Sequence, residues 1–153
     1  MKIGVGAITY AILKIDPNKQ VTFRWEEILN LKGNSGPYLQ YAHARCCSIL
    51  RKAGDWEVNY KVSKVNELEK AIIKTLLKFP KVVLSSTKDL KPNYVCNYAY
   101  ELATVFDKFY EHCPVLKAEN DELKNFRLTL VKVVKEILAI TLGLVLVHPL
   151  EKM

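Results

Sequence analysis

The chain has 153 residues, which is enough for one ordinary domain and leaves little room for a second. Half of the residues are hydrophobic and a quarter are charged, so the chain is globular and disorder is excluded as its main state. The 23 Lys and Arg residues outnumber the 16 Asp and Glu residues, and the net charge of +7 favours a polyanionic partner.

The first third of the chain is predicted to hold short elements followed by one long helix. The short elements are a helix over 4–14, an extended stretch at 21–23, a helix over 25–32 and a turn at 33–37. The long helix runs from Pro37 to Ala53, because proline suits the first turn of a helix and Gly54 suits its end.

Apolar residues at helical spacing predict four more helices in the rest of the chain, over residues 65–79, 80–90, 92–113 and 121–142. We expect Gly143 to end the last helix and residues 144–147 to pack back onto the others. The longest apolar run, 137–147, is about half the roughly 20 residues that span a bilayer. The predicted fold class is therefore all-α, a helix bundle.

Signatures of catalysis and of metal binding are missing from the sequence. Gly4 and Gly6 begin a dinucleotide fingerprint that lacks its third glycine, and there is no phosphate-binding loop, no Gly-x-Ser-x-Gly elbow and no His-Glu-x-x-His pair. The four cysteines form no Cys-x-x-Cys pair, which suits a reducing cytoplasm and argues against a zinc site. We therefore expect no catalytic residue, cofactor or metal in this chain.

The helix predicted over 37–53 has two distinct faces. Its core face carries Leu39, Ala42, Cys46, Ile49, Leu50 and Ala53. A second stripe carries Tyr38, Tyr41, Arg45, Ser48 and Lys52. Tyrosines interleaved with cations suit single-stranded nucleic acid, because bases stack on the rings while Arg and Lys hold phosphates. Half-buried tyrosines beside solvated cations would give the same pattern, and periodicity alone favours that interpretation.

The helix predicted over 92–113 divides in the same way. Its core stripe is Val95, Ala99, Leu102, Phe106 and Phe109. An adjoining face carries Tyr94, Tyr98, Glu101, Val105, Lys108 and His112. Tyr110 lies at the margin of the core stripe.

The segment from Gly33 to Arg45, GNSGPYLQYAHAR, resembles the first helix of the anticodon-binding domain of arginyl-tRNA synthetase. Other segments similar to that family are residues 5–10, 23–27, 48–53, 79–83, 98–103, 109–110, 113–116, 127–131 and 151–153. The resemblance covers essentially the whole chain. Phe126 departs from it, where the family usually has a small residue, and so does the Cys46-Cys47 pair.

The ATP-binding signatures of class I synthetases, His-x-Gly-His and Lys-Met-Ser-Lys, are missing. The segment from Lys61 to Lys64, KVSK, looks like the second signature but follows the family's connecting segment instead of preceding it. We therefore interpret it as a solvated loop and the start of a helix. The resemblance therefore implies the C-terminal part of a synthetase, either a fragment of a longer enzyme or a free-standing paralogue.

The resemblance implies a connector remnant of the catalytic body over residues 1–33 and an anticodon-binding bundle over residues 34–153. It places five residues at the anticodon stem-loop of tRNA(Arg): Tyr38, Tyr41, Arg45, Tyr110 and Met153. We add Lys52, which shares the helical stripe of Tyr38, Tyr41 and Arg45, as a sixth residue that would hold phosphate. The implied partners are that stem-loop and the catalytic body, with neither membrane nor DNA. ATP, Mg²⁺ and the ligase activity would belong to the parent enzyme in the cytoplasm. The alternative is a free-standing module that binds another protein, or that binds tRNA in trans.

Overall fold

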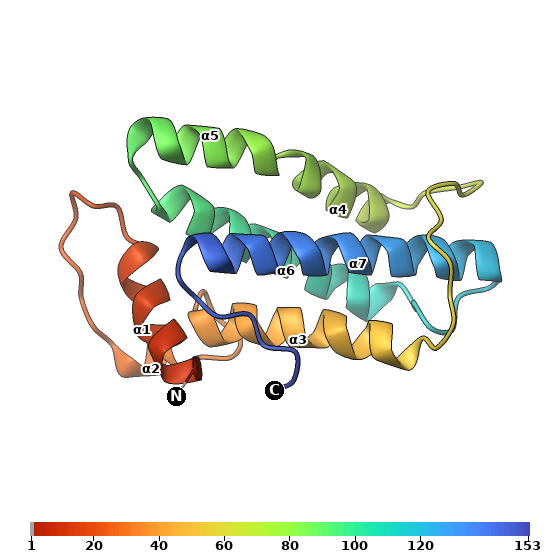
Figure 1. The fold of residues 1–153 in the computed structure, drawn as a ribbon, viewed down its shortest axis with the longest axis horizontal. Helices are drawn as coiled ribbons and strands as arrows, with labels where there is room; N and C mark the ends of the chain where they lie inside the picture. Colours follow the sequence, from red (N-terminus) through yellow and green to blue (C-terminus); the bar gives the residue numbers. More distant parts are fainter. Residues whose placement is uncertain (1) are drawn as a thin grey trace.

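The structure is a computed structural model that describes residues 2–153, and it folds them into helices joined by loops (Figure 1). The helices are α1 (Lys2–Leu13), α2 (Trp25–Ile28), α3 (Gly36–Lys52), α4 (Glu67–Leu77), α5 (Phe79–Asp89), α6 (Asn93–His112) and α7 (Asp121–Leu144). Within residues 2–153 there is no strand, so the all-α prediction is confirmed.

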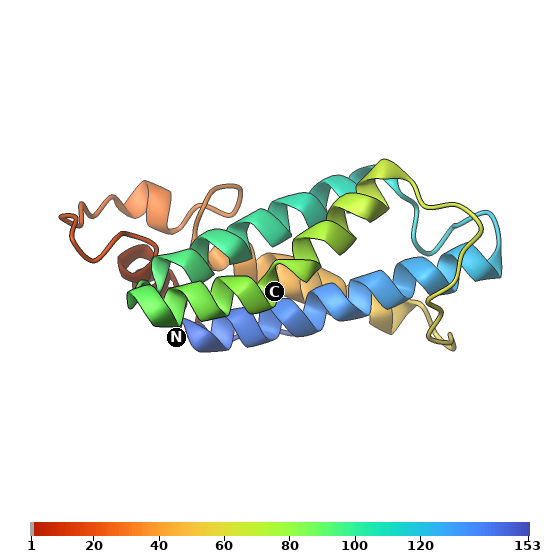
Figure 2. The same cartoon turned by 90° about the horizontal axis from the view of Figure 1, so that it is seen from above.

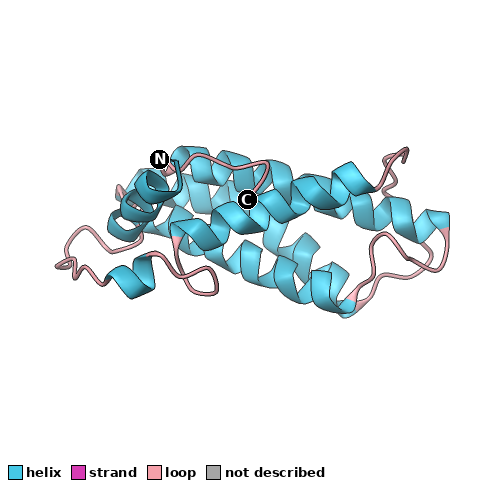
Figure 3. Ribbon diagram, turned by 90° about the horizontal axis from the view of Figure 1, so that it is seen from below, coloured by secondary structure: helices cyan, strands magenta, loops and turns pink. Residues whose placement is uncertain are grey.

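The three longest helices form the body of the bundle. Helices α3, α6 and α7 pack on one another, and α4 and α5 pack along α6, as Figure 2 shows from above. The core stripes predicted for α3 and α6 meet in this body: Leu39, Cys46, Leu102, Phe106 and Phe109 are all fully buried. Loops connect the helices at both ends of the bundle (Figure 3).

Short polar side chains begin three of the helices. Ser35, Asn66 and Asn120 each accept a hydrogen bond from the backbone N–H three residues further on, at the first turns of α3, α4 and α7. Such caps satisfy amide groups that have no partner within the helix. Gly54 follows α3 with a φ of +67°, in the left-handed region that favours glycine, which agrees with its predicted place after the helix.

Two predicted helix ends were wrong. Residues 21–23 lie outside any helix, and α2, which follows them, ends at Ile28 rather than near residue 32. Helix α7 continues through Gly143 to Leu144, because one glycine inside a helix costs only about 1 kcal/mol relative to alanine. The turn comes at Leu146, whose φ is +57°, and the Val147 N–H then bonds to the Leu142 carbonyl at 2.9 Å.

Helix α1 packs against the start of α3 instead of standing apart from the bundle. A Cβ added to Gly36 would lie 2.5 Å from the Gly6 carbonyl oxygen, so the two backbones approach closely. The hydroxyl of the buried Tyr10 lies 2.6 Å from the Asn34 Oδ1 and 3.0 Å from the Cys96 carbonyl oxygen, and these two acceptors share its single proton. The domain boundary at residue 33 stays a prediction, and these contacts tie both sides of it together.

A buried ion pair joins α4 to α7. The Arg127 Nε lies 2.7 Å from the Glu69 Oε1, and the two side chains are 9% and 1% exposed. The other carboxylate oxygen of Glu69 accepts from the Asn66 N–H, which completes the capping box of α4. Arg127 also donates to the Pro114 carbonyl at 2.9 Å, so this network fixes the loop between α6 and α7.

The structure offers little for metal or membrane chemistry. Among residues 2–153, no group of His, Cys, Asp and Glu side chains could hold a metal ion, and no helix is long and apolar enough to cross a bilayer. The thiols of Cys46, Cys47, Cys96 and Cys113 are free. Burial raises the pKa of the Cys96 thiol to about 12, which makes it unreactive near neutral pH.

Candidate nucleic-acid interface

The side chain of Arg45 lies against two tyrosine rings from different helices. The guanidinium carbon is 4.6 Å from the centre of the Tyr41 ring on α3 and 4.9 Å from the centre of the Tyr110 ring on α6. Both distances fit cation–π contacts. Tyr41 and Tyr110 remain 37% and 43% exposed, so each ring keeps a surface toward solvent. We call these three residues the clamp.

Asp107 on α6 fixes the orientation of the clamp. Its Oδ1 lies 2.6 Å from the Arg45 Nη1, and its Oδ2 accepts a hydrogen bond from the Tyr38 hydroxyl at 2.7 Å. The Arg45 Nη2 donates to the Tyr41 hydroxyl at 3.1 Å. Burial opposes the charge of Arg45, but Tyr41 and Asp107 outweigh that effect and raise the pKa of the guanidinium. Arg45 is therefore held as a cation in one geometry.

Two pockets adjoin the clamp and share Arg45, Ser48 and Tyr110 as walls. The first, the loop pocket, has a volume of about 300 Å³ and is completed by Ile49, Lys52, Pro114, Val115, Leu116 and Lys117. The second, the tail pocket, has a volume of about 450 Å³ and is completed by Tyr41, Ala44, Arg51, Glu151, Lys152 and Met153. Both fall in the size range of sites that hold small molecules or single residues of a partner.

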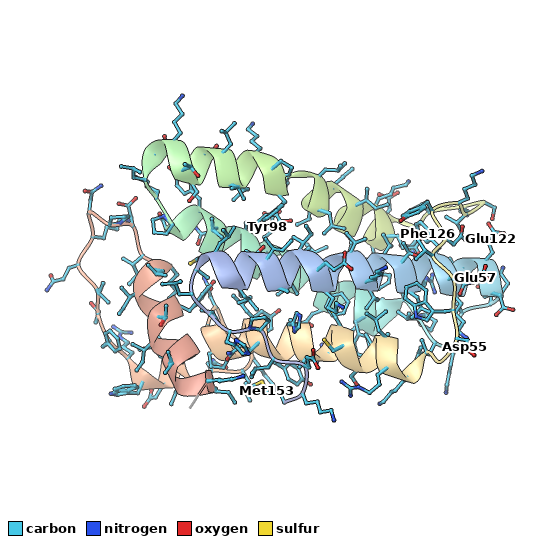
Figure 4. All side chains as sticks on the ribbon, viewed as in Figure 1. Asp55, Glu57, Tyr98, Glu122, Phe126 and Met153 are labelled. Atoms are coloured by element: carbon cyan, nitrogen blue, oxygen red, sulfur yellow. The ribbon has the colours of Figure 1, made fainter. Side chains whose placement is uncertain are left out.

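Five of the six predicted site residues come together here. Tyr41, Arg45 and Tyr110 form the clamp, Lys52 lines the loop pocket, and Met153 lines the tail pocket. Met153 comes from the segment that follows α7 and crosses α3 (Figure 4). Residues more than 100 positions apart in the sequence therefore meet at one place.

Tyr38 does not present the exposed ring that its place in the stripe predicted. Only 7% of it is exposed, and its ring packs edge-on against Tyr100 with centres 5.7 Å apart. Burial, followed by the hydrogen bond to Asp107, raises the pKa of its hydroxyl. Helix α6 covers this end of the stripe, so the Tyr38 ring has little free surface on which a base could stack. Tyr38 is linked to the clamp indirectly, because its hydroxyl donates to the Asp107 carboxylate that pairs with Arg45.

The predicted polar face of α6 also needs correction. Tyr98 is 3% exposed and packs against Phe79 on α5, with ring centres 5.6 Å apart, as its position in Figure 4 illustrates. The residues of α6 that reach the clamp are Asp107 and Tyr110, three positions apart on another side of the helix. Sequence reasoning missed Asp107, Arg51 and Lys117. The one sequence feature that could have indicated Asp107 is its position three residues before Tyr110, on the same side of the helix.

The charged side chains around the two pockets are mostly positive. Besides Arg45, the cations Arg51, Lys52, Lys117 and Lys152 line them, and Glu151 is the one acidic side chain in either lining. Exposed aromatic surface, a fixed guanidinium and several cations at adjoining pockets match the requirements for splayed bases and backbone phosphates of a single strand. The +7 net charge of the chain agrees in sign with such a ligand.

The helical bundle and its clamp are typical of a protein that binds single-stranded nucleic acid. Comparison with known proteins identifies the family. The family model for the DALR anticodon binding domain matches residues 39–153. The chain belongs to this family.

Curated relatives carry the name arginine–tRNA ligase. The protein from Pyrococcus abyssi is 46% identical over 99% of this chain, and the protein from Methanococcus maripaludis C6 is 44% identical over 94%. The chain spans about a quarter of the length of these relatives, 25% in both cases. Among solved structures, Thermus thermophilus arginyl-tRNA synthetase matches 99% of this chain with 27% of its own, at a TM-score of 0.94 and 36% identity. The Plasmodium falciparum enzyme matches with a TM-score of 0.86 and 30% identity.

Proposed function

We propose that this chain is the anticodon-binding part of an arginyl-tRNA synthetase and that it binds the anticodon stem-loop of tRNA(Arg). The observation that carries the proposal is the clamp, in which Arg45 lies over Tyr41 and Tyr110 at the junction of two pockets. Family membership and the curated relatives support the choice of RNA.

Each part of the site has a task in this proposal. Bases that leave the loop stack on the exposed surfaces of Tyr41 and Tyr110. Arg51, Lys52 and Lys117 neutralise phosphates, and Met153 closes the far side of the tail pocket. Arginine codons share a middle G, so their anticodons share a middle C, the one fixed base that this site can read. Tyr38 acts indirectly, because it holds the Asp107 that orients Arg45.

The remaining steps of arginylation are assigned to the part of the parent enzyme outside this chain. That part would bind ATP, Mg²⁺ and arginine in the cytoplasm. Its docking surface is proposed to be the outer face of the connector. Exposed apolar side chains lie on the outer side of α1 and around α2: Val5, Ile8, Ile12, Phe23, Trp25, Leu29 and Leu31. An apolar face of this extent marks a protein interaction site.

The same face favours a second candidate, a free-standing module that docks on another protein through α1 and α2. Size-exclusion chromatography of the chain, with and without an RNA hairpin, separates the two. A monomer that shifts to a one-to-one complex with RNA supports the anticodon-binding proposal. A chain that self-associates through its apolar face and ignores the RNA supports the interaction module.

Binding of a hairpin with an arginine anticodon tests the proposed function. We expect replacement of its middle C by U to weaken binding by about 5- to 10-fold, the effect of losing one hydrogen bond. We also expect the logarithm of the affinity to fall linearly with the logarithm of the salt concentration, with a slope of about −2, because three cations contact phosphates of a single-stranded loop. Fluorescence anisotropy measures both quantities. Equal affinity for the two hairpins together with a flat salt response would contradict the proposal.

A further inference from the structure

The chain that follows α7 turns back and crosses α3 before it reaches the tail pocket (Figure 1). Val145 and Val147 anchor its start in the core, each 1% exposed. The later residues 148–153 have no helical or strand structure and lie along the surface of α3. We call residues 148–153 the C-terminal strap.

Three side chains of α3 hold the strap through its backbone. The Gln40 Nε2 donates to the His148 carbonyl at 2.8 Å, the His43 Nδ1 contacts the Leu150 carbonyl at 2.7 Å, and the Arg51 Nη2 donates to the Glu151 carbonyl at 3.1 Å. These three side chains share one face of α3, because their spacing of three and eight residues follows the helical repeat. Bonds to carbonyl groups set the path of the strap whatever its side chains are.

His43 makes a short hydrogen bond to the strap from a buried position on α3. A carbonyl oxygen only accepts, so the Nδ1 of His43 must carry a proton and donate. The residue is 5% exposed, and burial lowers its pKa, which favours the neutral ring. Gln40 is fully buried, and neither it nor His43 lines the loop pocket or the tail pocket.

The strap carries Glu151, Lys152 and Met153 into the wall of the tail pocket, beside Tyr41 and Arg45. All three strap residues are exposed, so their own side chains contribute little to fixing the strap. Ordering a free backbone costs conformational entropy, and RNA binding would bear that cost if the strap were loose beforehand.

We propose that Gln40 and His43 are positioning residues for RNA binding, which act by holding the C-terminal strap so that Met153 forms the wall of the tail pocket. The proposal rests on the proposed function, because it assigns these residues to the same RNA site. They act without touching the RNA, through the backbone of His148 and Leu150.

The test combines two substitutions with a shortened strap. His43→Leu removes the donor, while His43→Asn keeps an N–H where Nδ1 lies, and His112→Leu at the exposed end of α6 is the matched control. In the full chain, His43→Leu should raise the Kd for the arginine anticodon hairpin about 5- to 10-fold, and His43→Asn should restore most of the affinity. In a chain that ends at Leu150, His43→Leu should cause no further loss, because the residues it positions are gone.

A second readout needs no RNA. Carboxypeptidase Y should release Met153 and Lys152 faster from His43→Leu than from the wild-type chain, His43→Asn or His112→Leu. Equal release rates, or a loss of affinity as large in the shortened chain as in the full one, would overturn the positioning role. A wild-type chain that binds no hairpin would overturn the proposed function instead, and the release rates would then still decide how the strap is held.

Discussion

Replacing Arg45 with alanine should weaken binding of the arginine anticodon hairpin by about 10- to 100-fold. Hydrogen bonds to a charged group contribute about 1.5–3 kcal/mol, and the substitution also removes the cation that lies over Tyr41 and Tyr110. Arg45→Lys should recover only a small part of the loss, because an ammonium group lacks the planar surface that packs on the two rings. Fluorescence anisotropy at fixed salt measures the change.

Arg24 offers a matched control for this experiment. Its side chain is 70% exposed in the connector and forms an ion pair with Glu27, three residues away. Arg24→Ala therefore removes the same charge as Arg45→Ala at a site far from the clamp in the sequence. Thermal unfolding of each variant checks that the fold is intact. Equal Kd values for Arg45→Ala and Arg24→Ala would show that the clamp is not the binding site, and that net charge alone accounts for any RNA binding.

The second large effect is on stability. Glu69→Ala should lower the free energy of unfolding by about 3–5 kcal/mol, because it leaves the Arg127 guanidinium buried without its partner. The same change removes half of the capping box at the start of α4. Urea unfolding followed by circular dichroism gives the free energy.

Glu67→Ala is the natural comparison, two residues earlier in the same helix. Glu67 is exposed and pairs with Lys70 at the surface, where ion pairs contribute little. We expect its replacement to leave the unfolding midpoint almost unchanged. If Glu69→Ala were no more destabilising than Glu67→Ala, the buried pair would not be holding α4 against α7.

Most of the helical framework could be predicted because its signals are local. Pro37, Gly54 and the apolar spacing in between mark the length of α3 to within two residues. The end of α7 could not be predicted in this way. It depends on Leu146 taking a left-handed conformation that leucine rarely adopts. The burial of Val145 and Val147 and the bond from the Val147 N–H to the Leu142 carbonyl hold this turn.

The site was predictable only in part, because a helical wheel cannot say which neighbouring helix covers a stripe. Tyr38 and Tyr41 belong to the same stripe of α3, but α6 covers the first and leaves the second at the surface. Asp107 gave no pattern of its own, and its importance comes from the meeting of α6 with α3. The bonds from Gln40 and His43 to the strap join residues more than 100 positions apart, which no local pattern encodes.

We propose that the RNA binds where α3, α6 and the C-terminal strap meet. Titration of the isotope-labelled chain with the arginine anticodon hairpin, followed through the amide NMR signals, shows which residues the RNA contacts. We predict the largest changes at Tyr41, Arg45, Arg51, Tyr110 and Met153, and none along the outer face of α5 at Lys81 and Leu84. Changes confined to α5, with the signals of Arg45 and Tyr110 unmoved, would contradict the account.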